Sequence, residues 1–82
     1  MEKKIHTITI TVNDREAAYK KVGELLHNYA DQINLRVGYP VPDKNIAVIF
    51  IIIELSSDEL GALSGRLGQL HSVKVKSSTI KM

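Results

Sequence analysis

The sequence predicts an α+β sandwich, in which a four-stranded antiparallel sheet carries two helices on one face. Three observations predict it. Residues 46–53 are eight consecutive apolar residues, mostly β-branched, which suit a pleated strand better than a helix. Segments with a period of two and segments with helical spacing alternate in the order βαββαβ. The length of 82 residues allows one such domain with a modest core.

The first strand covers residues 5–12, where alternation leaves one apolar face and one face rich in threonine. A helix is expected next, because Asn13 is a suitable N-cap and Glu16 follows three residues later, as in a capping box. The apolar residues of this helix recur at helical spacing, and we expect it to end between Tyr29 and Asp31.

The second strand covers residues 33–39, which alternate between apolar residues and other types. Pro40 ends it, and residues 42–45 form a turn into the strand at 46–53. We expect this third strand to lie at the centre of the sheet, beside the first.

The second helix begins at a cap formed by Ser56 or Ser57, with acidic residues in its first turn. Leucines at positions 60, 63, 67 and 70 mark its core face, and residues 73–80 form the last strand. This order of elements predicts a ferredoxin-like fold.

The composition is that of a soluble globular domain, with 44% apolar and 24% charged residues and a net charge of +2. The absence of cysteine excludes disulfides, a thiolate nucleophile and a zinc–thiolate site. No apolar run approaches the roughly 20 residues that cross a membrane, and residues 1–9 do not form a signal peptide. No nucleophile–base motif is present. We therefore expect a cytoplasmic protein that is not an enzyme and has no cofactor and no membrane contact.

The central strand is apolar on both faces, and two helices can cover only one of them. Three exposed isoleucines would forgo roughly 1.5–3 kcal/mol each. We therefore predict a homo-oligomer, a dimer or a tetramer, in which a second subunit covers the open face. The residues that we assign to this interface are Thr7, Thr9, Ile49, Ile51 and Ile53.

The second strand carries a candidate ligand site at Arg36, Gly38 and Tyr39. A guanidinium binds carboxylates and phosphates, and a glycine within a strand leaves room for a close approach. The structural alternative is that Gly38 bends the strand before Pro40 while Arg36 pairs with a surface acid.

The second helix contains three glycines, Gly61, Gly65 and Gly68, spaced so that they share one side. Each costs roughly 1 kcal/mol relative to alanine. A smooth stripe of this kind favours close packing of a helix, within or between subunits, over ligand contact. Gly61 and Gly65 nevertheless remain candidate ligand contacts.

The histidines at positions 6, 27 and 71 lie on separate elements and lack the paired spacing of metal ligands. We predict no metal site. His27 is the weak candidate, and its place near the end of a helix is also explained by the helix dipole.

Four collinear segments match a known family: residues 9–16 (TITVNDRE), 25–29 (LLHNY), 35–41 (LRVGYPV) and 61–68 (GALSGRLG). They resemble the iron-only hydrogenase system regulator family. The resemblance implies a single ACT-like domain over residues 1–82, similar to the C-terminal domain of the nickel-responsive regulator. It implies a transcriptional regulator that binds a small-molecule effector and contacts DNA only indirectly or weakly, because no DNA-binding motif is present.

Two departures limit what the resemblance implies. The nickel site of that regulator uses a His-x-His pair and a cysteine, and this chain has neither, so no nickel site is carried over. Residues 12–15 lack the glycine of many amino-acid-binding ACT domains, which argues against an amino acid as the effector. Two other functions stay open: direct binding of nucleic acid by a basic surface of the oligomer, and a structural adaptor for a hydrogenase maturation enzyme.

Overall fold

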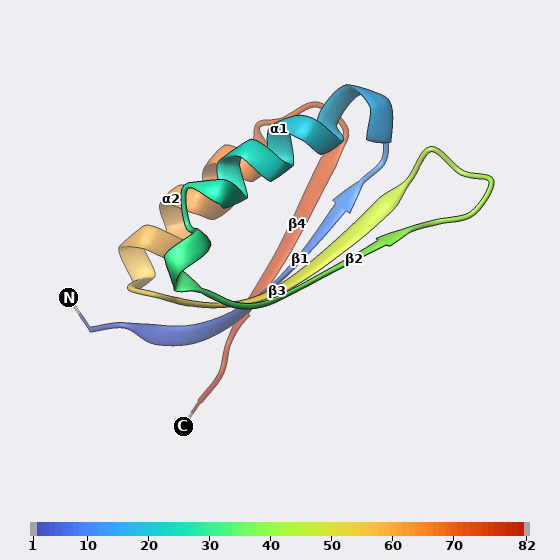
Figure 1. Cartoon of the computed structure of the whole chain (residues 1–82). Helices are drawn as coiled ribbons and strands as arrows, with labels where there is room; N and C mark the ends of the chain where they lie inside the picture. Colours follow the sequence, from blue (N-terminus) through green and yellow to red (C-terminus); the bar gives the residue numbers. More distant parts are fainter. Residues whose placement is uncertain (1, 82) are drawn as a thin grey trace.

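The computed structural model describes residues 2–81, which form a four-stranded antiparallel sheet with both helices on one face (Figure 1). The elements, in chain order, are β1 (Lys4–Val12), α1 (Arg15–His27), the 3₁₀ turn η1 (Ala30–Gln32), β2 (Ile33–Pro40), β3 (Ala47–Leu55), α2 (Ser57–Gly68) and β4 (Val73–Thr79). The strand order is β2-β3-β1-β4, so β1 and β3 are central. The predicted ferredoxin-like sandwich is confirmed. None of the helices in residues 2–81 is long and apolar enough to cross a membrane.

The register of the strands places side chains in rows across the sheet. Phe50 of β3 lies opposite Thr9 of β1 on one side and Val37 of β2 on the other. Thr9 in turn lies opposite Lys76 of β4. Since residues opposite one another in an antiparallel pair project from the same face, these four residues form one row on the open face.

The core lies between the sheet and the helices, and alternate residues of β1 and β3 supply its lower layer. Its fully buried side chains from the strands are Ile8, Ile10, Val12, Ile49, Ile51, Ile53 and Leu55. From the helices, Val22 and Leu26 of α1 and Leu63 and Leu67 of α2 are equally buried. This packing explains why both helices keep one apolar stripe.

The interface expected at Ile49, Ile51 and Ile53 is therefore wrong. Each of these side chains is 0% exposed, because the register of β3 turns this row toward the helices rather than toward the open face. A second subunit cannot reach them. The other expected interface residues, Thr7 and Thr9, do lie on the open face, where their neighbours on β3 are Ile52 and Phe50.

The caps of the helices differ in part from those expected. Asp14, not Asn13, caps α1: its Oδ1 accepts a hydrogen bond from the N–H of Ala17 at 3.2 Å. Asn13 lies one residue earlier, between β1 and the cap, and its N–H donates to the carbonyl of Ser72 at 2.7 Å. The helix α1 also ends earlier than expected, at His27, and a separate 3₁₀ turn follows.

A capping box was expected at the N-terminus of α1, but the structure has one at the N-terminus of α2 instead. The N–H of Glu59 donates to Ser56 Oγ at 3.2 Å, and the N–H of Ser56 donates to Glu59 Oε1 at 2.9 Å. The Nζ of Lys3 lies 3.0 Å from the same Oε1. These donors lower the pKa of Glu59 from 4.5 to about 2, with the backbone hydrogen bond from Ser56 as the largest cause.

Candidate functional site

Arg36 and Gly38 lie on the helix-facing side of β2, beside α1. A Cβ added to Gly38 would lie 3.5 Å from the hydroxyl of Tyr19, and one added to Gly23 would lie 3.9 Å from Nη2 of Arg36. A glycine on each element thus faces a large polar side chain on the other. We call these four residues, Tyr19, Gly23, Arg36 and Gly38, the α1–β2 seam.

The polar groups of the seam are accessible and have free donors. Arg36 is exposed and Tyr19 is 41% exposed. Within residues 2–81 neither side chain makes a hydrogen bond or an ion pair, and the one ion pair found there joins Lys3 and Glu59. The alternative in which Arg36 pairs with a surface acid is therefore not realised in the described part of the chain.

Tyr39, the third candidate on β2, lies on the other face of the sheet. It is opposite Val48, and it is 58% exposed. Alternation along the strand explains the separation, since Arg36 and Gly38 point toward the helices while Tyr39 points away. The structure thus brings together only two of the three candidates on this strand.

The open face of the sheet has an apolar half and a polar half. The apolar half consists of β2 and β3 residues: Leu35, Val37, Tyr39, Val48, Phe50 and Ile52. The other half consists of β1 and β4 residues that are polar except for Ile5 at its end: Ile5, Thr7, Thr9, Thr11, Lys74, Lys76 and Ser78. The three residues on β2 are the most exposed of the apolar set, at 44% for Leu35, 51% for Val37 and 58% for Tyr39.

The glycines of α2 line its exposed side. A Cβ added to Gly61, Gly65 or Gly68 would meet no atom within 4 Å. Close packing of this stripe within the subunit is therefore excluded, and close packing between subunits stays a prediction. Because α2 packs against β4, at the opposite edge of the sheet from β2, Gly61 and Gly65 also lie apart from the seam.

The N-terminus of α1 is occupied by the chain itself. The N–H of Arg15 donates to the carbonyl of Asn45 at 2.9 Å, and the N–H of Glu16 donates to Asn45 Oδ1 at 3.3 Å. Asn45 also donates through Nδ2 to Asp14 Oδ1 at 2.7 Å. The first amides of the helix, which often bind anions, therefore already have acceptors. No local pattern along the chain indicates this contact, since Asn45 lies 31 residues from Asp14.

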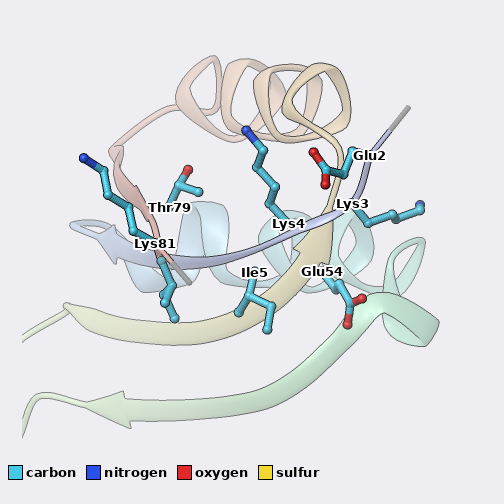
Figure 2. A pocket seen from close by; sticks show the side chains of 8 residues that line it. Glu2, Lys3, Lys4, Ile5, Glu54, Thr79 and Lys81 are labelled. Carbon is cyan, nitrogen blue, oxygen red and sulfur yellow. The ribbon is translucent and has the colours of Figure 1, made fainter.

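A pocket of about 580 Å³ lies where the two ends of the chain meet, and sequence reasoning missed it. Its lining includes Lys3, Lys4, Ile5, Glu54, Thr79 and Lys81. Figure 2 shows that Lys4 and Thr79 point toward the helices while Ile5 and Glu54 point to the other side of the sheet. The polar groups of mixed charge thus diverge rather than converge on one ligand position.

The histidines do not form a metal centre in the described part of the chain. Within residues 2–81 no three His, Cys, Asp or Glu side chains lie close enough together to hold an ion. His27 is exposed at the end of α1. His6 is fully buried and structural: its Nε2 donates to the carbonyl of Leu55 at 2.9 Å, and its Nδ1 accepts from the hydroxyl of Thr79 at 2.9 Å. The carbonyl can only accept, which fixes the position of the ring proton.

Comparison with known proteins identifies close and distant relatives. A family model for TM1266-like iron-only hydrogenase system regulators matches residues 4–77. The solved structure of the uncharacterized protein TM1266 from Thermotoga maritima is 51% identical in sequence, has a TM-score of 0.92, and is matched over 98% of this chain and 100% of that one. No curated protein matches the sequence.

More distant structures share the fold. The ACT domain of GTP pyrophosphokinase from Chlorobium tepidum is 18% identical, with a TM-score of 0.78 over 93% of this chain and 99% of that one. The C-terminal domain of MgtC from Mycobacterium tuberculosis is 14% identical, with a TM-score of 0.71 over 94% and 87% of the two chains. This chain therefore belongs to the family of TM1266-like iron-only hydrogenase system regulators, and its fold is that of an ACT domain.

Proposed function

We propose that this protein is a ligand-sensing regulatory domain of the iron-only hydrogenase system that works as a homo-oligomer. The observation that carries the proposal is the uncovered apolar half of the open face. Single exposed apolar side chains are ordinary, but a contiguous set on two adjacent strands marks an interaction surface. The family supports the regulatory part of the proposal.

The occupant that we infer for this surface is a second copy of the chain. The two edges of the sheet differ: β4 presents Lys74 and Lys76 to the open face, whereas β2 presents only apolar side chains. Lysines on an edge strand oppose association, and their absence from β2 leaves that edge available. The apolar half is continuous from the β2 edge to the centre of the sheet. Two copies that meet through this half bury it mutually and leave the lysines in solvent.

Regulation follows from association if an effector binds one assembly more tightly than another. The effector then shifts the population of subunits toward that assembly, by at most its difference in affinity. Because residues 2–81 contain no DNA-binding motif, the signal would pass to DNA through another protein.

Mutation of the apolar half tests the association. Val37→Glu places a charge in the middle of the proposed contact, and Lys76→Glu is the matched control because it lies in the same cross-sheet row at the other edge. We expect V37E to behave as a monomer in light scattering and K76E to keep the mass of the wild type. Equal masses for all three proteins would show that this face is not the contact.

Transcript levels test the regulatory role. In a strain that lacks the gene, we expect altered transcription of the iron-only hydrogenase genes, restored by the wild type and by K76E but not by V37E. Unaltered transcription in the deletion strain would contradict the role even if the protein is an oligomer.

The polar half of the open face favours nucleic acid as a second candidate partner. Lys74 and Lys76 project from it beside the threonines of β1. A contact with phosphates through these lysines would weaken as salt increases, with a slope set by the number of phosphates. A gel shift at low salt that is lost in K76E would support this function, and no shift at low salt would exclude it.

A further inference from the structure

We propose that the α1–β2 seam binds an oxyanion group, carboxylate or phosphate, of the effector, with Arg36 and Tyr19 as the donors. This inference rests on the proposed ligand-sensing function and assigns that function a site and a ligand class. It differs from the sequence-based expectation, because Tyr39 and the glycines of α2 are not part of the seam.

The first argument is the placement of the two glycines. Glycine in the middle of a helix is less favourable than alanine, and glycine within a strand also weakens the strand. The single atom within 4 Å of an added Cβ is Nη2 of Arg36 at Gly23 and the hydroxyl of Tyr19 at Gly38. At both glycines the side-chain atom nearest to an added Cβ is thus a polar group of the seam, at ordinary van der Waals distance. A core contact does not explain them, since no apolar atom lies within that distance.

The second argument is the spacing of the donors. Tyr19 and Gly23 are one helical turn apart on the same side of α1, and Arg36 and Gly38 are two residues apart on the same side of β2. A helical turn of about 5.4 Å and two strand residues of about 6.6 Å are nearly equal, so the two rows run alongside each other. The phenol therefore lies beside β2 at Gly38, and the guanidinium lies beside α1 at Gly23. An effector whose oxygens span the seam can accept from both donors at ordinary hydrogen-bond distances.

The third argument is chemical. A guanidinium stays charged in proteins, carries only donors, and binds carboxylate or phosphate with two parallel hydrogen bonds. No acidic side chain of residues 2–81 forms an ion pair with Arg36. The rival anion position at the N-terminus of α1 is already filled by Asn45. The seam is therefore the place where an external oxyanion finds free donors.

The position of the seam connects binding to assembly. Arg36 belongs to β2, the edge strand whose other face carries Leu35 and Val37. An anion that fixes Arg36 against α1 orders the same strand that we assign to the contact between subunits. Binding and association are then linked, and each must affect the other by the same factor.

Titration by ¹H–¹⁵N NMR with sodium phosphate, against sodium chloride at equal ionic strength, tests the site. We expect saturable shifts of the Gly23, Arg36 and Gly38 amides with phosphate and none with chloride. A parallel titration with sodium succinate shows which source of oxyanion binds at the lower concentration. Absence of saturable shifts with both oxyanions would overturn the proposal.

Three variants distinguish binding at the seam from a general effect of the protein's positive charge. Arg36→Gln is expected to weaken phosphate binding at least tenfold, and Arg36→Lys to weaken it less because a charge remains. Arg66→Gln is the matched control, since Arg66 is also exposed but lies on α2, where it lines a different pocket with Lys21 and Glu24. Equal affinity of R36Q and R66Q would overturn the proposal.

Failure of the seam as a binding site can be distinguished from failure of the proposed regulatory function. Light scattering on the same samples reports association independently of phosphate. If the protein is an oligomer and controls transcription but R36Q binds phosphate like the wild type, the seam is wrong and the regulatory function stands. If phosphate binds at the seam of a monomer, the site stands and the oligomeric mechanism is wrong.

Discussion

Glycines have two different roles in this chain, and their surroundings distinguish them. Gly23 and Gly38 each lie opposite a polar side chain of the α1–β2 seam, whereas the glycines of α2 have open space around the missing Cβ. A methyl group added in the first group would lie in ordinary van der Waals contact with a polar side chain of the seam. A substitution in the second group changes only the preference of the backbone for a helix.

Gly65→Ala is accordingly expected to stabilise the protein. The added methyl group meets no atom within 4 Å, and alanine is about 1 kcal/mol more favourable than glycine inside a helix. Urea denaturation should show the free energy of unfolding raised by about 0.5–1 kcal/mol. A decrease would indicate that a partner packs on the glycine stripe in solution.

His6→Ala is expected to have the opposite effect. The imidazole is fully buried and joins β1 to the carbonyl of Leu55 and the hydroxyl of Thr79. Its removal leaves a cavity and takes away two buried hydrogen bonds, which together cost about 2–4 kcal/mol. A loss below about 1 kcal/mol in the same denaturation experiment would contradict the structural role of this residue.

The helices and strands follow from the periodicity of the sequence, but the face of β3 that enters the core does not. Both rows of this strand are apolar, so burial could not be assigned from residue type. One signal was available: Glu54 lies in the same row of the strand as Ile52 and Phe50, and a carboxylate favours the solvent side. Residues 54 and 55 thus mark the exposed and the buried row.

The site was predictable only in part for a related reason. A candidate role for Arg36 and Gly38 could be predicted from their place on one strand. Their neighbours Tyr19 and Gly23 come from α1, and the packing of a helix on an edge strand sets which residues meet. No sequence pattern specifies how far the helix is shifted along the strand on which it packs. The same limit applies to Asn45, which reaches the start of α1 from a distant loop.

The capping box of α2 predicts a pH dependence of stability. The pKa of Glu59 is lowered from 4.5 to about 2 in the folded protein, so its ionised form stabilises the fold above 4.5, and this contribution is lost as pH falls toward 2. We expect Glu59→Gln to lower the melting temperature at neutral pH, and the difference from the wild type to shrink across this range. Asp58→Asn is the control, because Asp58 lies in the same turn and makes no side-chain hydrogen bond in residues 2–81. A constant difference between E59Q and the wild type would contradict the assigned cause.

At the scale of the whole molecule, the sheet is covered on one face only. The helices cover one face (Figure 1). The other face has an apolar half and a lysine-bearing half. The two halves of the open face therefore suit different contacts. The apolar half on β2 and β3 suits a second copy of the chain, and the half on β1 and β4 suits solvent or phosphates. The effector site proposed at the seam lies at the same edge as the proposed subunit contact.

The solution mass of the wild type and of V37E, measured by light scattering, tests the central claim most directly. We expect two or four times the mass of one chain for the wild type and the mass of one chain for V37E, with circular dichroism unchanged. A wild-type protein with the mass of one chain at all concentrations would contradict the claim that a second copy covers the open face.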